Sequence, residues 1–321
     1  TTDVDKAVLI GAGAGTGVLT SAADGIVLIG YTAGANITSG ANNLAIGYEA
    51  MKVHTTGHSN IAIGYGAMDD TDAGSNSNDS DHNLAIGVNA MGGTWANTKS
   101  EFNIAIGNNS LDGALDNAYY NIAIGQYSLG DLTTGDSNIA IGWASLEDIT
   151  AGSSNIAIGQ QAMQVHTTGE RNIAIGGGAM DDTNAGSTSL GSSDNMFIGH
   201  TAGGGTWTNA VAQYNVGIGN YVMDAAIAGA EYNTAVGFNS LGAITSGAQN
   251  TALGTQAGQN ITSGTANITI GVQSGVTMTT TQYTVLIGNS AGTAINSTDA
   301  NGTVAIGHEA GKAITHGLKN M

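Results

Sequence analysis

The chain has 321 residues, of which 41% are apolar and only 9% are charged, so its composition is not that of a disordered protein. Its net charge of −18 opposes binding to nucleic acids and to anionic membrane surfaces. The absence of cysteine removes disulfides and thiolate metal sites, and no apolar run reaches the roughly 20 residues of a membrane-spanning helix, so we expect no membrane insertion.

One five-residue motif recurs along the chain. It reads N-ψ-A-ψ-G, where ψ is Ile, Leu or Val, as in Asn60–Gly64. Seventeen copies are present; the glycine is invariant among them, and the first residue is asparagine in 13 of them. The alternation around the alanine predicts a short strand, and the glycine after it predicts a corner of the backbone. We take the Asn and Gly of three copies as reference positions for this structural motif: Asn60, Gly64, Asn138, Gly142, Asn172 and Gly176.

A second short apolar segment follows each motif glycine by three or four residues, as in Ala67-Met68. A third apolar position often lies seven residues after the glycine, and a T-[TSA]-G turn such as Thr55–Gly57 closes the unit. Each unit therefore reads as strand, corner, short strand and turn. Because a lone unit cannot bury its apolar side chains, the copies must stack. The sequence predicts an all-β fold, a single-stranded parallel β-solenoid of about 17 coils that is continuous over residues 1–321.

The spacing of the motif glycines reveals an internal duplication. The run 23, 20, 18, 17, 17, 17 occurs twice, at about residues 47–158 and 159–270, and the coils at both ends diverge. The sequences agree as well, because Val53–Gly57 and Val165–Gly169 both read VHTTG. We interpret this as duplication of a six-coil block, with terminal coils that cap the stack.

The stacking predicts where the motif side chains point. We expect the ψ side chains to face the interior and the motif asparagines to form a hydrogen-bonded ladder. The thin core then leaves the Met and Leu column after the motif glycine to pack between chains. This column comprises Met51, Met68, Met91, Leu111, Leu129, Leu146, Met163 and Met180.

Two sets of residues are candidates for binding. Asp70, Asp72, Asn76 and Asp79 offer the oxygen ligands that Ca²⁺ prefers, with a solvated acidic loop as the alternative. Trp95 and Trp207 lie at equivalent places in the two blocks, where they either stack on sugars of a receptor or anchor a long loop.

Nothing in the sequence indicates an enzyme. His54 and His166 occupy the position held elsewhere by Ile or Leu, so they read as wall residues and not as ligands. No nucleophile–base set recurs, and no pair of carboxylates is singled out for glycan hydrolysis. We expect no cofactor apart from the Ca²⁺ just described.

The unit N-x-A-[IV]-G-x-x-[AS] resembles the head repeats of trimeric autotransporter adhesins and, more closely, the N-x-A-[IL]-G-x-x-A arrays of bacteriophage tail-fibre proteins. The resemblance covers nearly the whole chain. It implies a left-handed parallel β-roll, a homotrimer, a place on a virion surface or outside the cell, and attachment to a host through a surface glycan or protein receptor. We therefore expect a tail-fibre or adhesin shaft. The alternatives are a bacterial surface adhesin or other extracellular filament, a glycan-cleaving tailspike and an ice-binding solenoid.

Overall fold

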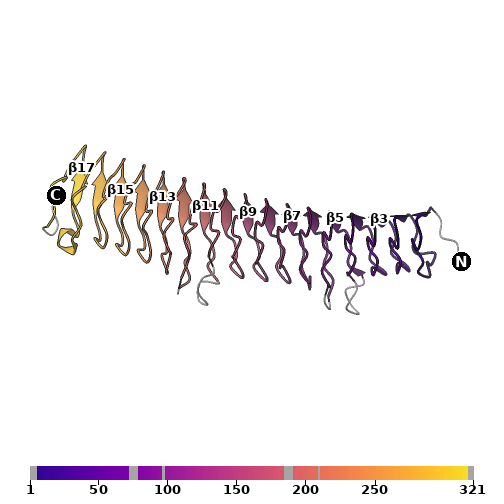
Figure 1. Ribbon diagram of the computed structural model, residues 1–321. Helices are drawn as coiled ribbons and strands as arrows, with labels where there is room; N and C mark the ends of the chain where they lie inside the picture. The colour runs from indigo at the N-terminus through magenta and orange to yellow at the C-terminus, as the bar shows by residue number, and fades with distance from the viewer. Residues whose placement is uncertain (1–5, 72–78, 96–97, 184–190, 209, 317–321) are drawn as a thin grey trace. The chain divides into compact units, whose positions relative to one another are not determined.

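The computed structural model describes residues 6–71, 79–95, 98–183, 191–208 and 210–316. The chain divides into two compact units, Thr1–Asn155 and Ile156–Met321. In each unit the coils place their strands side by side in a parallel sheet (Figure 1). Among the described residues, the helical structure is confined to the short 3₁₀ turn η2 (Thr298–Ala300) and a single 3₁₀ position at Asp79. The predicted all-β parallel solenoid is confirmed.

Every strand has three residues and coincides with the ψ-A-ψ part of one motif. In the first unit the strands are β1 (Val8–Ile10), β2 (Val27–Ile29), β3 (Leu44–Ile46), β4 (Ile61–Ile63), β5 (Leu84–Ile86), β6 (Ile104–Ile106), β7 (Ile122–Ile124) and β8 (Ile139–Ile141). In the second unit they are β9 (Ile156–Ile158), β10 (Ile173–Ile175), β11 (Met196–Ile198), β12 (Val216–Ile218), β13 (Thr234–Val236), β14 (Thr251–Leu253), β15 (Ile268–Ile270), β16 (Val285–Ile287) and β17 (Val304–Ile306). Neighbours pair in motif register, so that Ala105 lies opposite Ala123.

The motif glycines form the corners, as predicted. All 17 have φ between +123° and +144°, a conformation that side chains with a Cβ rarely adopt. Neighbouring coils also approach closely there: a Cβ added to Gly64 would lie 2.1 Å from the carbonyl oxygen of Gly87. The glycine is therefore required twice, by the turn and by the stacking.

The predicted asparagine ladder is present and buried. All 13 motif asparagines are at most 1% exposed. Asn138 donates from its backbone N–H (3.0 Å) and from Nδ2 (3.1 Å) to Oδ1 of Asn121, and Nδ2 also donates to the carbonyl of Gly152 (2.8 Å). Thr284 continues the ladder by donating its hydroxyl to Oδ1 of Asn267 (2.8 Å). The ladder satisfies backbone and side-chain polar groups that would otherwise be buried without partners.

The predicted direction of the ψ side chains is wrong. In β4 the middle residue Ala62 is buried, whereas Ile61 and Ile63 are half-buried, and the middle residue is the buried one in every strand from β2 onward. A strand alternates its side chains between two faces, so the pattern alone allows either choice. The interior is narrow, and the small alanine fits there while the larger isoleucines point outward.

The predicted interface residues are also buried in their own coils. Met51, Met68, Met91, Leu111, Leu129 and Leu146 of the first unit and Met163 and Met180 of the second are all 0% exposed within one chain. Placing these side chains between chains was therefore wrong. Because these side chains and the strand alanines are buried within one chain, each coil closes its own core.

A coil places its large core side chain at one of two positions, the middle of the strand or four residues after the motif glycine. Most coils combine Ala in the strand with Met or Leu four residues after the motif glycine. In the coil of β11, Phe197 takes the strand position, and Gly203 takes the place of the Met or Leu. A Cβ on Gly203 would lie 2.8 Å from the Phe197 ring, and one on Gly217 of the next strand 2.6 Å from it. The glycines thus make room for the aromatic ring.

This exchange predicts a compensating pair of substitutions. Phe197→Ala alone should destabilise the second unit by about 3–5 kcal/mol, because it empties a fully buried site. Phe197→Ala combined with Gly203→Met should recover most of that loss, because it recreates the Ala85–Met91 combination of the first unit. Urea denaturation of the wild type and both variants measures this. A double variant no more stable than the single one would contradict the proposed exchange.

The asparagine ladder predicts that one carboxylate introduced into it lowers the stability of the protein in a pH-dependent way. Asn138→Asp would place a carboxylate against two acceptors, Oδ1 of Asn121 and the carbonyl of Gly152. We expect a loss of about 3–5 kcal/mol at pH 7, which shrinks on acidification as the carboxyl is protonated. The exposed Asn117→Asp is the control and should change stability little at either pH. Equal losses at pH 7 and pH 4 would argue against the ladder as the cause.

Candidate functional site

The reference motif residues are structural. Asn60 and Asn172 are buried and donate from Nδ2 to the carbonyls of Ser80 and Ser192 at 2.9 Å. Together with Asn138 they belong to the ladder, and Gly64, Gly142 and Gly176 are corners with positive φ. These residues build the scaffold that positions the surface groups.

The two tryptophans do not meet solvent. Trp95 and Trp207 are both 0% exposed, so the interpretation in which these rings stack on sugars of a receptor is wrong. Trp207 packs edge-on against Phe197 with ring centroids 5.9 Å apart, and its Nε1 donates to the carbonyl of Gly203 (2.9 Å). An indole ring buries a large apolar area when it fills a core. The alternative, an aromatic plug that anchors a long loop, fits this geometry.

The acidic segment is only partly described. Asp72 and Asn76 lie outside the described residues. Asp70 accepts a hydrogen bond from the Thr94 hydroxyl, whereas Asp79 accepts one from Thr56 (2.8 Å) and lies 3.8 Å from the Lys99 ammonium. Among the described residues, no three His, Asp or Glu side chains are grouped so as to hold a metal ion. The Ca²⁺ site therefore stays a prediction.

The two buried histidines are wall residues in both blocks. His54 and His166 are at most 1% exposed, and their Nδ1 atoms lie 3.0 and 2.8 Å from the hydroxyls of Thr71 and Thr183. Each Nε2 lies 3.2 Å from the Nδ2 of a ladder asparagine. Burial lowers the pKa of each histidine to about 4. Both are neutral at pH 7 and belong to the core network.

The turn threonines form a column along the stack. Thr38 donates to the carbonyl of Thr55 (3.3 Å), and Thr133 donates to that of Thr150 (2.8 Å). These hydroxyl protons are engaged between coils and do not point to solvent. The arrangement does not favour the ice-binding alternative.

The ψ side chains, which are half-buried or exposed, form an apolar surface that we call the outer aliphatic face. In the first unit it consists of Val8, Ile10, Val27, Ile29, Leu44, Ile46, Ile61, Ile63, Leu84, Ile86, Ile104, Ile106, Ile122, Ile124, Ile139 and Ile141. The strands of the second unit carry the equivalent residues, with Thr234 and Thr251 among them. Aromatic side chains flank this face: Tyr31, Tyr48 and Tyr65 are 45–54% exposed, and their successive rings stack at 5.1 Å.

Acidic side chains are almost absent from this surface. We consider the ψ columns together with the flanking columns one residue after and five residues before each motif glycine. Of the 24 acidic residues, only Asp194 belongs to these four columns. It accepts hydrogen bonds from Arg171 at 2.7 and 3.0 Å. An acidic protein that keeps an apolar face this free of carboxylates has a surface suited to burial.

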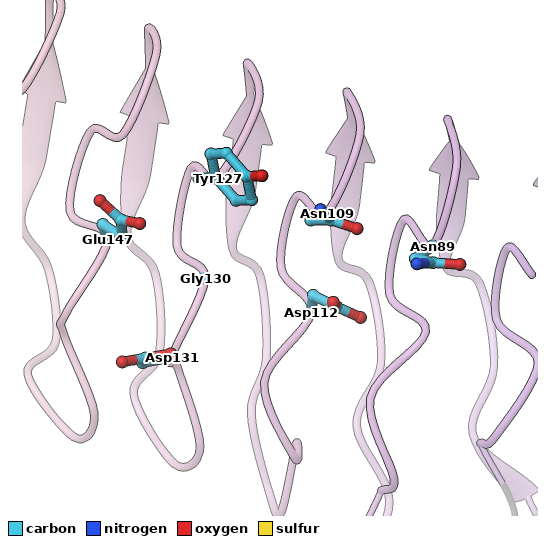
Figure 2. A pocket seen from close by; sticks show the side chains of 7 residues that line it. All are labelled: Asn89, Asn109, Asp112, Tyr127, Gly130, Asp131 and Glu147. Carbon is cyan, nitrogen blue, oxygen red and sulfur yellow. The ribbon is translucent and has the colours of Figure 1, made fainter.

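A polar groove lies on the segment after the motif glycines (Figure 2). It has a volume of about 370 Å³ and crosses the coils of β5 to β8 in the first unit. Asn89, Asn109 and Tyr127 form a row along successive coils, each two residues after its motif glycine. The carboxylates of Asp112, Asp131 and Glu147 lie beside this row, and Gly130 leaves space between them. Sequence reasoning missed the groove, because its residues come from four coils and form no contiguous motif.

Carboxylates in and near the groove are partly desolvated. Burial, and then the charge of Asp69, raise the pKa of Asp112 to about 6. The second block repeats the arrangement, because burial and the charge of Asp181 raise the pKa of Asp224 to about 6. Burial followed by the charges of Asp131 and Glu147 also raises the pKa of Asp148. Negative charge is therefore concentrated along this side of the coils.

The comparisons with known proteins identify no family. The sequence matches no protein-family model and none of the curated proteins. Within the part of the chain that the structure describes, no helix is long and apolar enough to cross a membrane.

The buried histidines predict a loss of stability in acid. An unfolded histidine titrates near pH 6.5, and these titrate near 4 when folded, so between these values the unfolded state binds more protons. The free energy of unfolding should therefore fall as the pH drops from 6.5 to 4, by up to about 3 kcal/mol per histidine. Above pH 6.5 the histidines contribute no pH dependence.

The measurement compares the wild type with His54→Leu/His166→Leu by urea denaturation at several pH values. Leucine occupies the same position in another coil as Leu132, so the variant has a precedent within the chain. The wild type should lose more stability than the variant between pH 6.5 and 4. Two curves that run parallel over this range would refute the assignment.

Proposed function

We propose that this chain is a structural shaft of an extracellular fibre, of the virion tail-fibre type, that attaches its particle to a host surface. The observation that carries the proposal is the outer aliphatic face, an apolar surface that repeats in coil after coil. Its side chains are half-buried or exposed in a single chain, and the acidic residues are kept away from it. Such a surface is suited to assembly and not to catalysis.

The partner that fits this face is a second copy of the same chain. Side chains on the face recur with the spacing of parallel strands, about 4.8 Å. A partner that matches them over several coils needs the same repeat, and a copy of this chain has it. The flanking aromatic columns, such as Phe102 and Tyr120 with ring centroids 5.2 Å apart, would border the contact. The resemblance to trimeric adhesin heads and tail fibres suggests three chains around a common axis.

The coils themselves supply the stiffness that a shaft needs. Each coil is joined to its neighbours by strand pairing, by the asparagine ladder and by side chains from the turns. Asp136, for example, accepts a hydrogen bond from the backbone N–H of Tyr119 in the preceding coil (2.7 Å). Contacts of this kind make stability a sum over neighbouring coils. Loops of different length between coils leave the register of the strands unchanged, as between β4 and β5.

Charges on the outer aliphatic face should dissociate the assembly. Ile106 and Ile124 are each 36% exposed in the single chain, so Ile106→Asp/Ile124→Asp should leave the coil intact. We expect the wild type to sediment as a trimer at micromolar concentration and the variant as a monomer with an unchanged circular dichroism spectrum. Ala114→Asp, at an exposed site away from the face, is the control and should remain trimeric. A wild type that sediments as a monomer, or a variant that stays trimeric, would overturn the proposed interface.

A further inference from the structure

The groove between the coils of β5 and β8 combines two kinds of chemistry. Asn89 and Asn109 offer amide donors and acceptors, and Tyr127, which is 36% exposed, offers a ring face and a hydroxyl. Asp112, Asp131 and Glu147 add acceptors that carry negative charge. A volume of about 370 Å³ suits a small organic ligand and is far larger than a single ion needs.

Four of the six basic residues of the chain form ion pairs elsewhere in the part that the structure describes. Lys52 pairs with Glu49, Lys99 lies near Asp79 and Glu101, and Lys312 pairs with Glu309. Arg171 binds Glu170 and Asp194. The charges of Asp131 and Glu147 repel the neighbouring Asp148, whose pKa they help to raise. A ligand with a positive charge would relieve this repulsion.

The duplicated block shows that the fold does not require two of these carboxylates. Asp131 corresponds to Ala243, and Glu147 corresponds to Gln259, in coils of the same length. The backbone bond is the same in both places: the N–H of Asp131 donates to the carbonyl of Glu147 at 2.9 Å, and that of Ala243 donates to Gln259 at 2.8 Å. Because the coil forms equally with Ala and Gln, its stacking does not explain Asp131 and Glu147.

From these observations we propose that the groove binds an oligosaccharide that carries free amino groups. Carboxylates bind the ammonium groups, the asparagine amides bind the hydroxyls, and the Tyr127 ring packs against a sugar ring. The asparagines and the tyrosine recur at the coil spacing of about 4.8 Å, close to the length of one sugar unit in an extended chain. This inference deepens the proposed attachment function and rests on it, because it names the kind of receptor that the shaft recognises.

The test uses the full chain and two ligands that differ in charge, the hexamer of β-1,4-linked glucosamine and its fully N-acetylated form. Isothermal titration calorimetry should show binding of the glucosamine hexamer, weakened by salt, and much weaker binding of the acetylated hexamer. Asp131→Ala/Glu147→Gln, which carries the residues of the second block, should reduce affinity about tenfold or more.

Two further variants distinguish binding in the groove from non-specific electrostatic attraction of a cationic ligand to an acidic protein. Glu231→Gln/Asp299→Ala removes the same charge from the second unit and should bind like the wild type. Gly130→Gln fills the groove without changing the charge and should weaken binding; the glycine has negative φ, and the nearest neighbours of an added Cβ lie at 3.5 Å or more. Equal binding of both hexamers, equal losses in the two double variants, unchanged affinity of Gly130→Gln, or no binding at millimolar ligand would each overturn the proposal.

Sedimentation of the same samples keeps this inference apart from the proposed assembly. A trimer that does not bind the glucosamine hexamer refutes ligand binding in the groove and does not affect the proposed assembly into a shaft. A monomer that binds the hexamer refutes the proposed assembly and does not affect the proposed ligand binding in the groove.

Discussion

The close approach of successive coils at the motif glycines is the constraint on which the rest of the structure depends. A Cβ at Gly64 would lie 2.1 Å from the carbonyl of Gly87, so no other residue permits this spacing. Once the corners are in contact, the strands pair in motif register and the asparagines fall into one column. Each Asn Oδ1 then accepts from the next asparagine, as Asn103 does from Asn121 at 3.0 and 3.1 Å. Register, polar satisfaction and the alignment of surface columns all follow from the same contact.

Because the coils stack in register, the direction in which a side chain points in one coil is repeated in its neighbours. The repetition produces a continuous surface of one composition. The inward alanine and the Met or Leu after the corner close the core of each coil, which leaves the ψ side chains outside. Repetition makes them an outer aliphatic face, and the acidic residues are confined to other columns. Self-assembly through that face would bury the apolar columns and leave the groove beside Asn109 and Tyr127 open to solvent, because it lies on the segment after the corner.

Comparison of the two duplicated blocks distinguishes residues that stabilise the coil from residues that vary between equivalent coils. His54 and His166 make the same contacts with a threonine and a ladder asparagine, and Trp95 and Trp207 are equally buried. These pairs belong to the scaffold. Asp131 and Ala243, by contrast, share a backbone geometry and differ in charge. Such differences mark positions that stacking does not constrain, and Asp131 and Glu147 of the groove are among them, whereas Asp112 and Gly130 recur as Asp224 and Gly242.

The period, the strand and corner of each coil, and the asparagine ladder follow from the repeated motif alone, because a repeated local pattern stacks in only one register. Asn60, Asn138 and Asn172 with their glycines could be assigned from the motif alone. Which face of the strand is buried depends on how the coils pack in three dimensions. An alternating strand of Ile-Ala-Ile is compatible with either direction, and the choice depends on how much volume Met68 and its counterparts supply to a narrow core. The packing of the coils also decides that Trp95 and Trp207 are buried, because that depends on whether the neighbouring coils leave room for an indole. The groove was beyond sequence reasoning for a related reason: residues from four coils become neighbours only when the coils stack.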